Sequence, residues 1–211
     1  YELNSNKLFM PASNNKLYTC VAALHYLGRD HTFKTTILKN NNDLVLKGGG
    51  DPDLSIEQLD SLAHATAGIV KDVNTLYLDA TLLDSMHYGN GWMWDEGSWW
   101  YAAPIGALSV NDNCIDFHIE PGKLGQPAII NHFPTTEYIS QSNKTTTVDS
   151  NIELKKLKVE RDWVGRTNHF SMTGEIAISD SSDTLQRNIN DPTLFTGTCL
   201  LYTSPSPRDG L

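Results

Sequence analysis

A helical pattern near the N-terminus constrains the fold of this chain more than any other feature of its sequence. Apolar side chains recur there at intervals of three and four residues, the spacing of one helix face: Leu17, Cys20, Val21, Leu24 and Leu27. Gly28 follows, where a left-handed helix stop is favoured. Because Pro11 cannot lie inside a helix, it marks the residue after which the helix is expected to begin. Ser13 is then expected in the first turn, and Cys20 is expected to be a buried core thiol.

Ser13 and Lys16 are three residues apart at the start of this helix, so their side chains are expected on one face. A serine hydroxyl is a poor nucleophile at neutral pH, but a lysine amine that burial or a nearby cation keeps neutral can accept its proton. Free N–H groups and the helix dipole in the first turn would favour a developing oxyanion. The same spacing also arises by chance, so a catalytic pair and an ordinary polar pair are both open on spacing alone.

Residues 11–19 resemble the active-site segment of penicillin-binding proteins, in which Ser-x-x-Lys is the acylation motif. Three further blocks resemble successive signatures of the D-alanyl-D-alanine carboxypeptidase/endopeptidase family, the class C low-molecular-mass penicillin-binding proteins: residues 48–54, 91–96 and 101–113. With Asn190, Asp191 and Pro192, the resemblance covers nearly all of residues 1–198 in the family's order.

This resemblance implies an α+β fold in two parts. Residues 1–34 would begin a catalytic domain of the penicillin-binding and serine β-lactamase type, and residues 35–198 would form an inserted, mostly β region. The local pattern agrees, because alternating segments predict short strands at 33–38, 44–46, 76–79 and 115–119. Ser55 and Gln58 form a capping-box pattern that predicts a second helix.

The last residues, 199–211, resemble the translation of a transposase sequencing adapter more than a protein segment. The alternative is a natural tail rich in serine and proline. We expect the segment to be non-native. Because the chain opens at Tyr1 without a methionine, we also expect the N-terminus to be missing.

Two other segments imitate the remaining motifs of penicillin-binding proteins. Ser109 and Asn111 spell Ser-x-Asn, but their context resembles a block inside the family's insertion, so a structural role is expected. Thr173 and Gly174 lack the lysine of Lys-Thr-Gly and are expected to be ordinary strand and turn. Two of the three motifs that build the cleft are therefore missing, and this chain is expected to be inactive as it stands. The glycines at 48–50 are expected to form a tight turn that needs a positive φ.

Composition excludes several classes of partner. The net charge is −9, from 16 Lys and Arg against 25 Asp and Glu, with no basic run, which argues against nucleic acid or an anionic membrane surface. The sequence contains no stretch of 18 apolar residues, so no transmembrane helix is predicted. Three cysteines without a CxxC pair and seven scattered histidines predict neither a metal site nor a cofactor.

Glu96 is the substrate-binding residue that the resemblance implies. In the family, an acid that follows a Trp-x-Trp element receives the side-chain amine of the peptidoglycan stem peptide, and the matching position is Glu96, where many relatives have aspartate. The alternative is a packed aromatic corner in which Asp95 and Glu96 are surface acids.

The resemblance implies a serine-type D-Ala-D-Ala carboxypeptidase or endopeptidase of the periplasm or extracytoplasmic cell envelope. Its partners would be peptidoglycan stem peptides and β-lactam antibiotics, with Ser13 as nucleophile and Lys16 as base. Two alternatives stay open: a related Ser-x-x-Lys hydrolase such as a β-lactamase or esterase, and a peptidoglycan-binding module without chemistry.

Overall fold

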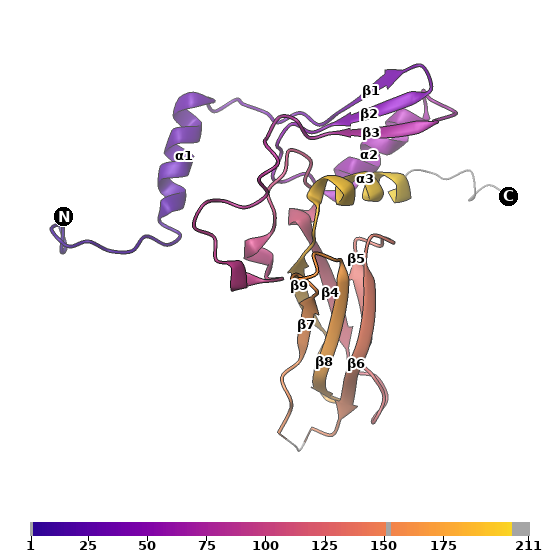
Figure 1. Ribbon diagram of the computed structural model, residues 1–211. Helices are drawn as coiled ribbons and strands as arrows, with labels where there is room; N and C mark the ends of the chain where they lie inside the picture. Colours follow the sequence, from indigo (N-terminus) through magenta and orange to yellow (C-terminus); the bar gives the residue numbers. More distant parts are fainter. Residues whose placement is uncertain (1, 151–152, 204–211) are drawn as a thin grey trace. The chain divides into compact units, whose positions relative to one another are not determined.

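A computed structural model describes residues 2–150 and 153–203, and the chain divides into two compact units (Figure 1). The first unit ends at Phe33 and the second begins at Lys34, so the division falls one residue before the predicted end of the catalytic segment.

The first unit contains the predicted helix, α1, which spans Asn15–Tyr26 and is followed by Gly28 with a φ of +81°. The prediction that Ser13 lies in the first helical turn is wrong. Asn14 is the N-cap, and Ser13 lies in the preceding turn, where the N–H of Asn15 donates to the carbonyl of Ala12 at 3.0 Å. The prediction of a buried Cys20 is also wrong, since Cys20 is exposed. A single helix cannot bury its own apolar face.

The second unit begins with a three-stranded sheet in the order β1-β2-β3 (Figure 1). Strands β2 and β3 are parallel and are connected through α2, as a parallel pair requires. The capping box that predicted α2 is confirmed, because Ser55 Oγ accepts from the N–H of Gln58 at 3.2 Å and Gln58 Oε1 accepts from the N–H of Ser55 at 2.8 Å. The bounds are β1 Thr36–Asn40, β2 Asp43–Lys47, α2 Ile56–Ala67 and β3 Thr75–Asp79.

Two further three-stranded sheets share one core. Their orders are β5-β4-β9 and β6-β8-β7, and the β6–β8 pair is parallel. Phe117 of β4 and Phe170 of β8 are fully buried, with ring centroids 4.9 Å apart, so the two sheets meet through these rings. The bounds are β4 Cys114–Glu120, β5 Ile129–Phe133, β6 Ser140–Val148, β7 Lys158–Arg161, β8 His169–Ala177 and β9 Asp183–Asn188. The predicted α+β class is confirmed, and Thr173 and Gly174 lie inside β8.

Short 3-10 helices interrupt the long connection between β3 and β4: η1 Trp94–Glu96, η2 Trp100–Ala102 and η3 Asn111–Asn113. The glycine turn that precedes α2 packs against this connection. Gly50 has the expected positive φ, +72°, and its N–H donates to the carbonyl of Ala107 at 3.0 Å. A Cβ on Gly48 would overlap the same carbonyl oxygen, so the close approach of two backbones requires glycine there.

The last helix, α3 (Pro192–Thr203), continues across the predicted boundary at residue 199. Cys199 and Leu200 are 2% and 3% exposed and belong to the core of the second unit. The non-native origin of 199–211 stays a prediction, and its residues 204–211 lie outside the described part of the chain. Among the described helices, none has the length and apolar character needed to cross a bilayer.

Candidate functional site

Ser13 and Lys16 are in contact at the start of α1. Lys16 Nζ donates to Ser13 Oγ at 3.2 Å, and the N–H of Lys16 donates to the carbonyl of Ser13 at 3.0 Å. Both residues are exposed. A hydroxyl and an amine at this distance are within reach of direct proton transfer, the arrangement of a nucleophile with its own base.

Ser109 and Asn111 instead hold the backbone of the turn that contains η3. Ser109 Oγ donates to the carbonyl of Gly106 at 3.0 Å and accepts from Asn113 Nδ2 at 2.9 Å. Asn111 Nδ2 donates to the carbonyl of Cys114 at 3.0 Å. Since these polar atoms are engaged with their own loop, the Ser-x-Asn spelling has a structural role, as expected from its context.

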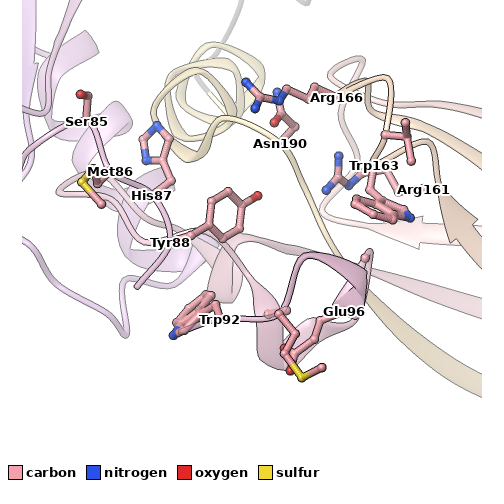
Figure 2. Close-up of a pocket in the computed structure, with 14 residues that line it drawn as sticks. Ser85, Met86, His87, Tyr88, Trp92, Glu96, Arg161, Trp163, Arg166 and Asn190 are labelled. Carbon is pink, nitrogen blue, oxygen red and sulfur yellow. The ribbon is translucent and has the colours of Figure 1, made fainter. Parts of the chain in front are cut away.

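Glu96 lines a cavity of about 690 Å³ in the second unit (Figure 2). The walls come from the loop that follows β3, from η1, from the turn between β7 and β8, and from the segment between β9 and α3. Several of the side chains that line it are aromatic or cationic: Tyr88, Trp92, Arg161, Trp163 and Arg166. Glu96 belongs to this second unit, whereas Ser13 and Lys16 belong to the first.

The backbone next to Glu96 is shaped by glycine. Gly97 has a φ of +59°, and a Cβ built on it would lie 3.2 Å from Nε1 of Trp163. The indole therefore packs directly against the Gly97 backbone, beside Glu96. Trp99, Trp100 and Tyr101 are each about half exposed, so the segment of residues 92–102, called the aromatic segment below, is partly open to solvent.

Arg161 and Asn188 form the buried centre of this region, and sequence analysis did not identify either of them. Asn188 is fully buried, and its Nδ2 donates to three carbonyls of the aromatic segment, those of Gly97, Trp99 and Ala102, at 2.8 to 3.1 Å. Its Oδ1 accepts from Arg161. Nothing in the sequence around Asn188 distinguishes it, because all residues of the segment 179–188 except Leu185 are polar.

Two arginines of this region, Arg161 and Arg187, are buried. Burial lowers the pKa of Arg161 and of Arg187 from its ordinary value, because the charged form is desolvated. The guanidinium of Arg187 lies 4.5 Å from the centre of the Trp99 ring, a cation–π contact, and its Nε donates to the carbonyl of Val159. Within residues 2–150 and 153–203, no carboxylate forms an ion pair with either arginine.

The described residues contain no group of three or more His, Cys, Asp or Glu side chains that could hold a metal ion.

Comparison with known proteins gives a consistent set of relatives. A family profile described as the D-Ala-D-Ala carboxypeptidase 3 (S13) family matches residues 1–202. The chain is 30% identical over 213 residues to a D-alanyl-D-alanine carboxypeptidase of Actinomadura sp. (strain R39). This alignment covers 93% of this chain and 39% of that protein. It is 29% identical over 161 residues to the D-alanyl-D-alanine carboxypeptidase DacB of Haemophilus influenzae. This alignment covers 68% of this chain and 34% of that protein.

The fold is similar to that of penicillin binding protein 4 (dacB) from Haemophilus influenzae. The TM-score is 0.74 at 24% identity, over 92% of this chain and 45% of that structure. The same protein in complex with a β-lactam matches with a TM-score of 0.63 at 23% identity, over 92% and 42%. The chain thus spans less than half the length of each of these proteins.

Proposed function

Because the chain belongs to the D-Ala-D-Ala carboxypeptidase 3 (S13) family, we propose that it is part of a serine-type D-Ala-D-Ala carboxypeptidase acting on peptidoglycan stem peptides. The observation that supports this most directly is the 3.2 Å contact between Lys16 Nζ and Ser13 Oγ. Two partners follow from the proposal, stem peptides and β-lactams, together with an extracytoplasmic location at the cell envelope.

In the proposed reaction, Ser13 Oγ attacks the carbonyl carbon of the D-Ala-D-Ala bond while Lys16 Nζ accepts the hydroxyl proton. The resulting oxyanion is held by a hole that includes the N–H of Ser13. When the intermediate collapses, the C–N bond breaks, the terminal D-alanine takes a proton as it leaves, and an ester to Ser13 remains. Water then adds to the ester and releases the shortened peptide and free Ser13.

Glu96 is proposed to bind the side-chain amine of the stem peptide. Its carboxylate lines a cavity with aromatic walls, where an ion pair with an ammonium group is less screened than at an open surface. Glutamate has the same charge as the aspartate of many relatives but is one methylene longer, so its carboxylate can reach a slightly different point in the cavity.

Labelling with fluorescent penicillin tests the proposed nucleophile. In the full-length protein, the wild type and a Ser61→Ala control are expected to form a covalent adduct of one label per chain, and Ser13→Ala none. Ser61 is a suitable control because it is an exposed serine at which Oγ donates to the carbonyl of Glu57 within α2. A label on Ser13→Ala would refute the assignment.

The same assay separates the alternative functions. A stable adduct together with release of D-alanine from a stem peptide supports the carboxypeptidase. Fast release of hydrolysed penicillin without peptide cleavage would identify a β-lactamase. Binding of peptidoglycan without any adduct would identify a non-catalytic module.

A further inference from the structure

Arg161 is a buried cation whose charge is not balanced by an ion pair. The residue is 4% exposed, yet it lines the cavity that contains Glu96 (Figure 2). Within residues 2–150 and 153–203, no carboxylate lies within ion-pair distance of its guanidinium. Buried charges in proteins are generally paired, so this arginine requires an explanation.

The carboxylate of the neighbouring acid, Asp162, forms hydrogen bonds within its own turn. Asp162 Oδ1 accepts from the N–H of Gly165 and Oδ2 from Thr167 Oγ1, both at 3.0 Å. The N–H of Thr167 also donates to the carbonyl of Asp162, at 3.1 Å. The negative charge of Asp162 supports the charged form of Arg161 from a distance but occupies none of its donors.

The hydrogen bonds of Arg161 to Asn188 and Thr167 do not use all N–H donors of its guanidinium. A guanidinium carries five N–H bonds. Nε donates to the carbonyl and Oδ1 of Asn188, Nη2 donates to Oδ1 of Asn188, and Nη1 donates to the carbonyl of Thr167. These contacts use one N–H on each nitrogen, so each Nη retains a second N–H. Tyr88, on the cavity wall, also interacts with this guanidinium and takes up part of that capacity, and Asp162 and Tyr138 favour its charged form as well.

A second cation lines the same cavity. Arg166 is exposed, and its backbone is held by the turn between β7 and β8, where its N–H donates to the carbonyl of Trp163 at 3.2 Å. Arg166 has a φ of +53°, a conformation that is uncommon for a residue other than glycine. Asp162 stabilises this turn from both sides, so the position of Arg166 is set before any ligand binds.

From these contacts we propose that the cavity is a binding site for an organic carboxylate, which Arg161 anchors at the buried end and Arg166 at the exposed end. A planar carboxylate matches the paired N–H donors of a guanidinium. The aromatic walls, Trp92 and Trp163, favour a ligand with a carbon chain over a free inorganic anion. Glu96 lies in the same cavity and opposes the binding of an anion, so two positive groups compete there with one negative group.

This proposal is independent of the reaction at Ser13, because it concerns binding to the second unit alone. The carboxylate could belong to a peptide or to a free small molecule, and the two sources are distinguished by using two probes. One probe is glutarate, with its neutral analogue glutaramide as the matched control. The other is the dipeptide N-acetyl-Ala-Glu-amide, with its Gln counterpart as control.

The experiment is an NMR titration of the 211-residue chain that follows the indole N–H of Trp163, assigned with Trp163→Phe. Saturable shifts are expected with the carboxylate probes and none with their amide controls. Tighter binding of the dipeptide than of glutarate would identify a peptide-borne carboxylate, and the reverse would identify a free one. Equal shifts from charged and neutral probes would overturn the proposal.

Four variants identify the groups that bind. Arg161→Gln is expected to abolish binding, and Arg166→Gln to weaken it about 10-fold or more, as the loss of one charge-assisted contact predicts. Glu96→Gln should strengthen binding about 2- to 5-fold, because it removes the opposing charge. Arg29→Gln, an exposed arginine of the first unit, should leave it unchanged.

Arg161 also has a structural role, so its variant can fail to fold. Arg166→Gln and Glu96→Gln decide the question in that case, since their effects have opposite signs. If both variants bind the probes as the wild type does, the proposal is wrong.

Discussion

Two donors of Arg161, Nε at 3.2 Å and Nη2 at 3.0 Å, converge on Oδ1 of Asn188. The two residues are 27 positions apart, at the ends of β7 and β9. Since the amide of Asn188 also holds the carbonyls of Gly97, Trp99 and Ala102, one buried side chain connects the cationic side of the cavity to its aromatic side.

Asn188→Ala is expected to lower the free energy of unfolding of the second unit by about 3 to 5 kcal/mol. The substitution removes the side-chain acceptor of a buried guanidinium, which keeps only the carbonyls of Asn188 and Thr167, and removes the side-chain donor that three carbonyls share. Denaturant unfolding followed by tryptophan fluorescence measures the change. The control is Asn42→Ala, an exposed position that should stay within about 0.5 kcal/mol of wild type. A loss below about 1 kcal/mol for Asn188→Ala would contradict the role assigned to it.

Lys16→Ala should slow penicillin acylation of the full-length protein by about 1,000-fold or more, because a nucleophile and its base act as a unit. Stopped-flow measurement of adduct formation gives the rate. Lys7→Ala removes an exposed lysine of the same unit and is the matched control. If the two variants acylate at equal rates, Lys16 is not the base.

Glu96→Gln keeps the shape of the side chain and removes its charge. For stem peptides with a free side-chain amine, kcat/KM of the full-length protein should fall by roughly 5- to 150-fold, while penicillin acylation changes little. Asp95→Asn, at the exposed neighbouring acid, is the control. Equal losses for amine-bearing and N-acetylated peptides would show that Glu96 does not bind the amine.

The three cysteines should differ in their reactivity toward a thiol reagent. Cys20 is exposed, whereas Cys114 and Cys199 are buried. Burial raises the pKa of Cys199 to about 12 and also raises that of Cys114, so little reactive thiolate forms at either. Iodoacetamide at pH 8 should label Cys20 first, as peptide mass spectrometry can measure. In denaturant, the three cysteines should be labelled at equal rates. Fast labelling of Cys114 in the native protein would contradict the buried position of its thiol.

The same pKa shifts predict that the protein loses stability in alkali. The two thiols are neutral in the folded state but ionise near pH 9.0 once the protein is unfolded. Their contribution to the free energy of unfolding is therefore complete below that pH and is lost as the pH rises above it. Each thiol accounts for a slope of about 1.4 kcal/mol per pH unit. Unfolding free energies at pH 8 to 10 test this, and a Cys114→Ala and Cys199→Ala double variant should show a shallower slope.

The sequence by itself determined the features that depend on near neighbours. The three- and four-residue spacing predicted α1 and its end at Gly28, and the Ser55 and Gln58 pattern predicted the start of α2. Alternation predicted β4. The order of the motifs along the chain was enough to indicate the family, because Ser-x-x-Lys and the later blocks are local arrangements of residues.

The tertiary structure decided what depends on residues that are far apart in the chain. Pairing of β4 with β9 and of β7 with β8 brings Arg161, Asn188 and the aromatic segment together, and no periodic pattern encodes that approach. Cys20 shows the same limit, since an apolar pattern suggested that it is buried, and the structure shows that it is exposed. Burial is a property of what packs against a residue, so it is decided by contacts that the local sequence does not contain.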